Sequence, residues 1–242
     1  MKQNASGLAV AWRPRTEHDP DPILHTSPLM LIPLANVDVD EATSVFHDFA
    51  EGWERRRLNT FVRHRDRRRY AHAHGAMRLA LSQVLRCSAA DVTLRRTGTG
   101  KPYLRGGPAF SLSYVDGDAW LAIGLEEAVG LDVVAFDFGE GELDELIAPQ
   151  AEKQAVNRVM PSLARPDVVV WAAKEAAAKL ADRVEVAPED WRVRFTHCLE
   201  VSAEDVPAAR VDIVRMDAAL VAAIARPLQP GDAAAYGTQV AS

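Results

Sequence analysis

Cysteine is scarce in this sequence, with two residues among 242, and they lie in unrelated contexts at positions 87 and 198. They give no basis for a disulfide framework or a zinc site, and they suit a reducing compartment. No apolar run reaches the roughly 18 residues that a membrane-spanning helix needs. The N-terminal stretch also lacks the long apolar centre of a signal peptide. We therefore expect a soluble, cytoplasmic protein without membrane association.

An excess of positive charge is missing too. Lysine and arginine number 28 against 34 aspartates and glutamates, which gives a net charge of -6. A nucleic-acid-binding role therefore has no electrostatic support. No Walker-type loop and no Ser-His-Asp arrangement can be drawn from the residue spacing, so neither a P-loop site nor a serine hydrolase is expected. Apolar residues make up 48% of the chain, which is enough for a sizeable core.

The periodicity of the apolar residues places the chain in the α+β class. Helical spacing is found over residues 40–59, 65–86, 143–159 and 166–180. Short apolar or alternating runs predict strands over residues 27–37, 92–96, 109–114, 119–125, 129–134, 191–195 and 209–216, with a further short strand over 8–12. Each half thus carries a long helix and several strands, which suits two similar lobes. We expect a loose arm over 1–28, an N-terminal lobe over 29–126, a C-terminal lobe over 127–230 and a frayed tail over 231–242.

Three segments contain candidate functional residues, and each also has an ordinary structural interpretation. Gly100-Lys-Pro102 followed by Ser111-Leu-Ser113 places a lysine on a tight turn near hydroxyls. That suits a phosphate, although such a turn and strand are common. Asp132 stands among apolar residues at a strand end, where it either caps an amide or binds a hard metal such as magnesium. Glu175 and Lys179 share one helical face, either as a solvent-facing pair or as residues that reach a cleft together.

Taken in order, these segments resemble the 4'-phosphopantetheinyl transferase superfamily, in its larger single-chain, two-lobed (surfactin-synthetase-activating) type. The family pattern runs G-K-P, an S-H dipeptide on a strand, G-I-D-x-E and W-x-x-K-E-x-x-x-K. This chain has Gly100-Lys-Pro102, Ser113-Tyr114, Gly130-Leu-Asp-Val-Val134 and Trp171 through Lys179. Upstream, Arg55-Arg-Arg57 before Phe61 and Arg65-Asp66 before the long helix also fit, so the resemblance covers residues 50–196.

The resemblance implies magnesium-dependent transfer of the phosphopantetheine arm of coenzyme A to a serine of an acyl or peptidyl carrier protein. It implies that coenzyme A lies in a cleft between the lobes, that Asp132 and Glu175 bind the metal, and that Glu175 takes the serine proton. Lys179 would stabilise charge on the pyrophosphate and leaving group. The coenzyme A contacts that it implies come from Arg57, Arg96, Thr97, Lys101, Ser113, Tyr114 and Lys179.

Two expectations about partners follow from the resemblance. Because two lobes in one chain complete the cleft, we expect a monomer. Carrier proteins of this family are usually acidic and helical, so a basic patch formed by Arg63, Arg65, Arg67, Arg68 and Arg69 could steer one toward the cleft. The alternative for this arginine run is an ordinary solvated helix face.

The chain departs from the family pattern at three places. Tyr114 stands where the family usually has histidine, and a tyrosine hydroxyl can donate a hydrogen bond but adds no positive charge. Val134 stands where many relatives carry a third acidic ligand. Lys179 is followed by Leu180-Ala-Asp-Arg-Val184 instead of a Gly-x-Gly turn. These departures leave a second interpretation open, a repurposed or catalytically degenerate member of the same fold that acts on or binds a pantetheine-linked partner.

Overall fold

The computed structural model describes residues 29–229 apart from positions 116, 140, 142 and 162, so the expected arm, its short strand and the expected tail lie outside it. Its helices are α1 (Val39–Phe49), α2 (Gly52–Thr60), α3 (His64–Leu85), α4 (Gln150–Val159) and α5 (Pro166–Ala181). Its strands are β1 (Leu29–Pro33), β2 (Leu94–Arg96), β3 (Pro102–Leu104), β4 (Ala109–Val115), β5 (Asp118–Gly124), β6 (Gly130–Ala135), β7 (Arg192–Phe195), β8 (Leu199–Ala203), β9 (Val206–Arg215) and β10 (Leu220–Pro227). None of the described helices combines the length and apolar character needed to cross a bilayer.

The strands form three antiparallel groups. The first half contributes a three-stranded sheet in the order β1-β5-β4 and a separate β2-β3 hairpin. The second half contributes a five-stranded sheet in the order β6-β10-β9-β8-β7. Antiparallel sheets with separate helices confirm the α+β class.

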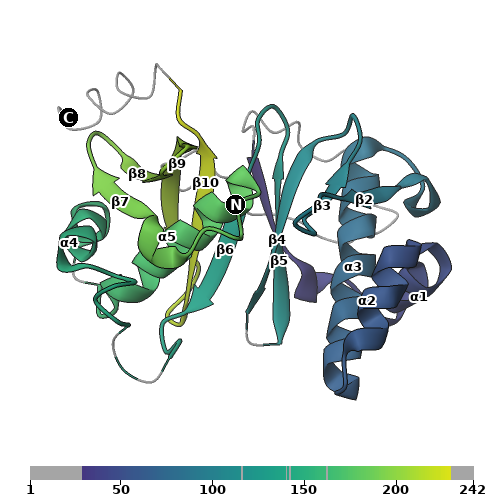
Figure 1. Cartoon of the computed structure of the whole chain (residues 1–242). Coiled ribbons are helices and arrows are strands. Elements are labelled where there is room, and N and C mark those ends of the chain that lie inside the picture. Colours follow the sequence, from purple (N-terminus) through teal and green to yellow (C-terminus); the bar gives the residue numbers. More distant parts are fainter. Residues whose placement is uncertain (1–28, 116, 140, 142, 162, 230–242) are drawn as a thin grey trace.

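The two sheets lie between the long helices, in the order helix, sheet, sheet, helix (Figure 1). Helix α3 packs on the outer face of the three-stranded sheet, where Met77 contacts the cluster that contains Leu121. Helix α5 packs on the outer face of the five-stranded sheet through alanines and valines. The inner faces share a third core, which includes Leu31 from β1 and Leu131 and Ile224 from β6 and β10. Strands β4 and β6 therefore meet at the centre of the molecule.

Two of the four expected helices have different bounds in the structure. The expected helix over 40–59 is two helices, because Ala50 and Glu51 are extended and Glu51 begins α2 with a capping box to Glu54. The expected helix over 143–159 begins only at Gln150, after Pro149. Proline disfavours helical backbone in the residue before it, so the segment upstream forms turns instead. The helices expected over 65–86 and 166–180 are confirmed within one residue at each end.

Three strands were not expected from the sequence, namely β3, β8 and β10. The omission of β10 matters most, because this strand lies between β6 and β9 and six of its eight residues are buried. Its run Leu220–Pro227 is rich in alanine, a residue of low strand propensity, so the segment lacks the usual β-branched signal. Burial on both faces stabilises it as a strand instead.

Candidate active site

A cavity of about 680 Å³ lies where the two halves meet. Its walls come from α2, α3, the turn between β2 and β3, strand β4 and the C-terminal end of α5. The lining includes five of the expected coenzyme A residues, namely Arg57, Arg96, Lys101, Tyr114 and Lys179. These five residues thus converge from segments that are far apart in the chain, whereas Thr97, Ser113 and the expected metal ligands Asp132 and Glu175 are not among the lining residues.

Lys179 is the residue that joins the cavity to the expected metal ligands. Its Nζ lies 2.6 Å from Oδ1 of Asp132 and donates to the carbonyl of Leu131 at 3.0 Å. Oδ1 of Asp132 also accepts a hydrogen bond from the hydroxyl of Ser113 at 3.0 Å. An ammonium and a hydroxyl therefore satisfy this nearly buried carboxylate, which would be costly to bury alone.

The position of Asp132 depends on Gly130, two residues earlier on β6. A Cβ at Gly130 would lie 2.0 Å from the carbonyl oxygen of Ala176, so only glycine lets α5 approach the strand this closely. The close approach brings one face of the helix, with Glu175 and Lys179, over the start of β6. This explains physically why a glycine precedes the aspartate.

The serines of β4 join the two sheets. Strand β6 is an edge strand, so its outward N–H groups have no ladder partner. Ser111 accepts the N–H of Leu131, and Ser113 accepts the N–H of Val133, both at 3.0 Å. Ser113 is 1% exposed. Its hydroxyl accepts the hydrogen bond from Val133 and donates one to Asp132. The described contacts thus place Ser113 at the junction of the two sheets, and its expected contact with a phosphate stays a prediction.

Glu175 lies beside this network and forms no ion pair of its own with any of the described residues. Burial raises the pKa of Glu175, and the charge of Asp132 raises it further, whereas Lys179 acts in the opposite direction. The two carboxylates are therefore within electrostatic reach of each other. Two such carboxylates fit a Mg²⁺ ion, which prefers a few carboxylate oxygens together with water and phosphate.

The turn between β2 and β3 is fastened to the end of α5. Lys101 donates through Nζ to the carbonyl of Lys179 at 2.5 Å. The hydroxyls of Thr97 and Thr99 both bond to Oδ1 of Asp182, that of Thr97 at 3.2 Å. Burial and the charge of Lys179 lower the pKa of Lys101, while Asp182 opposes this shift. Thr97 thus contacts the second half directly and is absent from the cavity lining.

Arginines at the cavity lie over aromatic rings. The guanidinium of Arg57 is 5.0 Å from the ring centroid of Phe61, and that of Arg96 is 5.9 Å from the centroid of Trp53. Such cation–π contacts orient a guanidinium while its N–H groups stay available. Both arginines are exposed and line the cavity, so they can reach an anionic ligand there.

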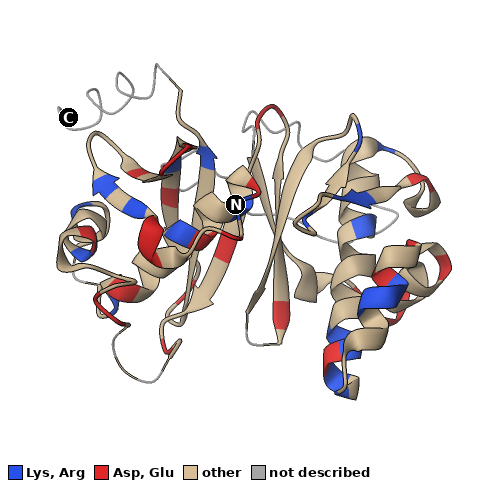
Figure 2. Ribbon diagram, viewed as in Figure 1, with Lys and Arg blue, Asp and Glu red and all other residues tan. Residues whose placement is uncertain are grey.

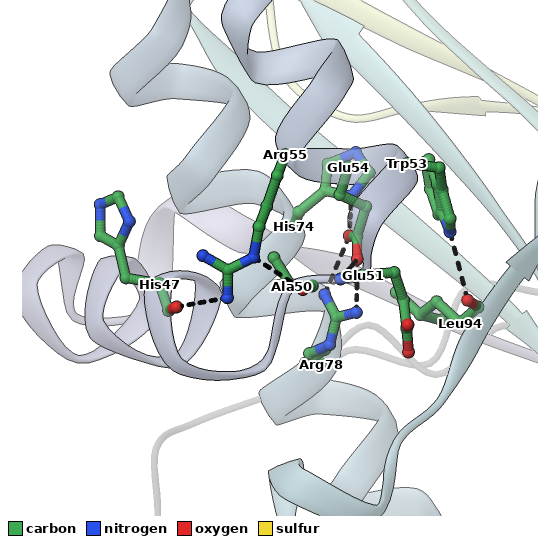
Figure 3. Close-up of polar contacts among 9 residues, drawn as sticks. All are labelled: His47, Ala50, Glu51, Trp53, Glu54, Arg55, His74, Arg78 and Leu94. Carbon is green, nitrogen blue, oxygen red and sulfur yellow. Dashed lines mark hydrogen bonds and ion pairs between the residues drawn. The ribbon is translucent and has the colours of Figure 1, made fainter.

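His74 lines the cavity, although the sequence did not predict it there, and it belongs to a buried polar cluster with Glu54 and Arg78 (Figure 3). The carboxylate of Glu54 lies 2.7 Å from Nδ1 of His74, with which it forms a hydrogen bond. It also accepts hydrogen bonds from both terminal guanidinium nitrogens of Arg78. Burial opposes ionisation, but the bonds from His74 and Arg78 lower the pKa of Glu54 to about 2. Burial in turn lowers the pKa of His74, so this histidine is neutral at physiological pH. No local pattern could have paired residues 20 to 24 positions apart.

Tyr70 extends from this cluster to the cavity. Its ring lies 4.0 Å from that of His74, centroid to centroid. Its buried hydroxyl has no hydrogen-bond partner among the described residues. An unpaired buried hydroxyl is costly, so a polar group of a ligand in the cavity would stabilise it. From the sequence, Tyr70 was predicted only to lie on the apolar face of its helix.

The three departures from the family pattern have distinct structural settings. Tyr114 lines the cavity, and withdrawal of its hydroxyl from water raises its pKa, so it remains a neutral donor. Val134 lies on the same face of β6 as Asp132, but it is buried in the core beneath α5. Asp182 follows α5 with a φ of 56°, the left-handed conformation that glycine usually occupies at a helix end. Its carboxylate accepts hydrogen bonds from the hydroxyls of Thr97 and Thr99.

Comparisons with known proteins found no match. No protein-family model matches the chain, and no curated protein does. The resemblance to phosphopantetheinyl transferases therefore depends on the sequence motifs alone.

Proposed function

We propose that the protein has the 4'-phosphopantetheinyl transferase fold and transfers the phosphopantetheine arm of coenzyme A to a serine of an acyl or peptidyl carrier protein in the cytoplasm. One observation carries this proposal. Lys101, Asp132, Glu175 and Lys179 come from three separate segments, yet Lys179 contacts Asp132 through its ammonium and Lys101 through its carbonyl. A shared, charged site at the junction of two halves is what a diphosphate and a cation require.

The cavity offers separate groups for separate parts of coenzyme A. Arg57 and Arg96 can bind phosphate through guanidinium N–H groups, and Lys101 adds a point charge. Tyr114 and the unpaired hydroxyl of Tyr70 can donate or accept hydrogen bonds. Asp132 and Glu175 would hold Mg²⁺, which supplies charge neutralisation for the pyrophosphate.

The reaction then follows from the positions of Glu175 and Lys179. The carrier serine oxygen forms a bond to the phosphorus that bears pantetheine, and the bond from that phosphorus to the bridging oxygen breaks. The serine proton passes to Glu175, directly or through water. Lys179 stabilises the charge that develops on the leaving adenosine 3',5'-bisphosphate.

The test is a transfer reaction with coenzyme A, Mg²⁺ and a panel of apo carrier proteins. Intact mass of the carrier and release of adenosine 3',5'-bisphosphate are measured together. The proposal predicts that the carrier gains the mass of phosphopantetheine and that chelation of Mg²⁺ prevents the gain. No mass gain with any carrier, while coenzyme A binds, would reject ordinary transfer.

A second candidate is a repurposed or catalytically degenerate member of the same fold that binds a pantetheine-linked partner. The structural setting of Tyr114 and Asp182 favours it, because both cavity residues differ from the family pattern. This candidate predicts that coenzyme A or a holo carrier protein raises the thermal midpoint by mass action, without transfer. Binding without transfer in the reaction above would therefore select it.

The carrier would approach the arginine-rich end of α3. Arg63, Arg65, Arg67 and Arg68 are exposed there, next to α2 with its own arginines, and basic segments gather at this end in Figure 2. Arg69 instead bonds to the carbonyl of Asp118 and faces the cavity. A local basic surface on an acidic protein suits a small acidic domain. Reversing the charges of Arg67 and Arg68 should raise KM for the carrier and leave coenzyme A affinity unchanged.

A further inference from the structure

The turn between β7 and β8 gathers three potential metal ligands of three different kinds. His197, Cys198 and Glu200 each offer one ligand atom, and these atoms all lie within 4.8 Å of one another. The turn is far along the chain from the cavity residues, and none of the three lines that cavity. It closes the hairpin at the edge of the five-stranded sheet, where β7 has a neighbour on one side only.

The hydrogen bonds around His197 orient its imidazole ring. The hydroxyl of Thr196 donates its single proton to Oε1 of Glu200. The hydroxyl oxygen of Thr196 also lies 3.1 Å from Nδ1 of His197, and because its own proton goes to Glu200 it accepts a hydrogen bond from Nδ1 at this contact. In the neutral imidazole with this tautomer, Nε2 is the nitrogen that has a lone pair for a ligand. A carboxylate or hydroxyl that orients an imidazole in this way is the usual outer support of a metal-binding histidine.

Nε2 of His197 is buried and has no hydrogen-bond partner among the described residues. A buried nitrogen with a bare lone pair requires a donor, a water molecule or a cation to offset its lost hydration. Cys198 is 3% exposed beside it. The turn therefore combines an unsatisfied imidazole with a sheltered thiol and a carboxylate.

The donor set selects the class of ion. Nitrogen, sulfur and oxygen donors suit Zn²⁺, which binds imidazole, thiolate and carboxylate with equal ease. Mg²⁺ is excluded here because it prefers oxygen ligands and keeps several waters. Three protein ligands leave a fourth tetrahedral position for water. No zinc site was expected from the sequence, because the two cysteines lie in unrelated contexts. Only one of them, Cys198, takes part in this cluster.

We propose that the β7–β8 turn binds one Zn²⁺-class ion through His197, Cys198 and Glu200, independently of the proposed active site. The ion replaces the proton of the thiol, which is released to solvent, so binding weakens as the pH falls. Bound metal links the turn, through His197 and Cys198, to Glu200 on β8. It therefore stabilises the hairpin that carries the outermost strand of the five-stranded sheet.

The test is titration of the metal-stripped, full-length protein with Co²⁺, whose bond to thiolate gives an intense charge-transfer absorption. Cys87 is exposed and lies elsewhere, so Cys87→Ser is the matched control, and it leaves Cys198 as the sole thiol. His18 and His25 are present in every variant, so any Co²⁺ that they bind is the same in all the titrations. The proposal predicts one equivalent of tightly bound Co²⁺ with the thiolate band in the wild type and in Cys87→Ser. Zn²⁺ should displace it.

Two variants decide the assignment. Cys198→Ser should abolish the thiolate band, and Glu200→Gln should weaken Co²⁺ binding by at least tenfold while circular dichroism stays native. Glu200 is partly exposed, so its replacement keeps the test valid even if the buried Cys198 variant folds poorly. Absence of the thiolate band in the folded wild type, or its loss in Cys87→Ser with survival in Cys198→Ser, would overturn the proposal.

Discussion

The ammonium of Lys179 lies 2.6 Å from the carboxylate of Asp132, although 47 positions separate the two residues. One comes from the last turn of α5 and the other from edge strand β6. Lys179 therefore neutralises Asp132 but leaves Glu175, on the same helical face, without equivalent compensation. This imbalance leads to the first prediction.

Glu175→Gln should stabilise the metal-free protein and abolish transfer. The pKa of Glu175 is raised in the folded state, so the folded protein binds this proton more readily than the unfolded chain. Stability is then lost as the pH rises from about 4.5 through the raised pKa. Glutamine carries no charge, so the variant should unfold at a higher urea concentration than wild type at pH 7, and the difference should vanish near pH 4.

Transfer by Glu175→Gln should fall at least about 100-fold, the range for loss of a group that moves a proton or holds charge. Glu126→Gln, on an exposed turn, is the matched control and should alter neither property. An active Glu175→Gln variant would contradict the assigned role.

The buried Glu54 cluster should make the first half sensitive to acid. The pKa of Glu54 is depressed to about 2, so its stabilising ionisation is present above about pH 4.5 and lost as the pH falls toward 2. His74 prefers the neutral form, so its contribution is present above about pH 6.5 and declines below it. Stability in urea should therefore fall progressively from pH 7 to pH 3.

Glu54→Gln should cost about 3–5 kcal/mol at pH 7, because it leaves the fully buried Arg78 without its partner charge. The deficit should shrink toward pH 2, where wild type loses the same charge. The exposed Glu41→Gln serves as control. A Glu54→Gln protein as stable as wild type would show that the cluster is not a net stabilising unit.

Tyr114→His should strengthen coenzyme A binding in a pH-dependent way. Tyr114 is a neutral hydrogen-bond donor at the cavity, and a protonated imidazole would add charge toward phosphate. We expect several-fold tighter binding at pH 6 than at pH 8 by isothermal titration calorimetry. Tyr103 on β3 has similar exposure but lies outside the cavity lining, so Tyr103→His is the control. Equal affinity of Tyr114→His at both pH values would contradict this role for position 114.

Asp182→Gly should loosen the turn of residues 97–101 at little net cost in stability. Glycine relieves the strain of the left-handed conformation, about 1 kcal/mol, while loss of the carboxylate frees Thr97 and Thr99. Hydrogen exchange of this turn, followed by mass spectrometry, should accelerate. Asp182→Asn tolerates the same backbone and keeps an oxygen acceptor, so its turn should stay protected. Acceleration in both variants, or in neither, would show that this contact does not hold the turn.

The sequence predicted the α+β class and both long helices, α3 and α5, and the roles of the candidate site residues stay predictions. Gly130, Asp132, Glu175 and Lys179 could be found because strand and helix periodicity place each in a defined local setting, and their order matched a known pattern. The break between α1 and α2 at Ala50 could not be predicted from the sequence. It depends on the capping box of Glu51 and Glu54, and the same residues are also compatible with a continuous helix. Strand β10 could not be predicted because it is rich in alanine, which has a low strand propensity and is held in the sheet by tertiary burial.

The roles of individual site residues were harder to predict than their positions. Ser113 was expected at a phosphate, but the edge of β6 uses its hydroxyl, and this depends on how two sheets meet. Glu54, 20 residues from His74, orients the imidazole, and the ring of Tyr70 packs against that imidazole at the cavity. Such contacts between distant segments leave no periodic signal in a single sequence.

The most direct measurement of the central claim is calorimetric titration of coenzyme A into the wild-type protein, with and without Mg²⁺, beside the variant Asp132→Asn. The account predicts binding of one equivalent of coenzyme A that Mg²⁺ tightens at least tenfold in wild type and leaves unchanged in Asp132→Asn. Absence of binding to the folded wild type, or an equal effect of Mg²⁺ on both proteins, would contradict it.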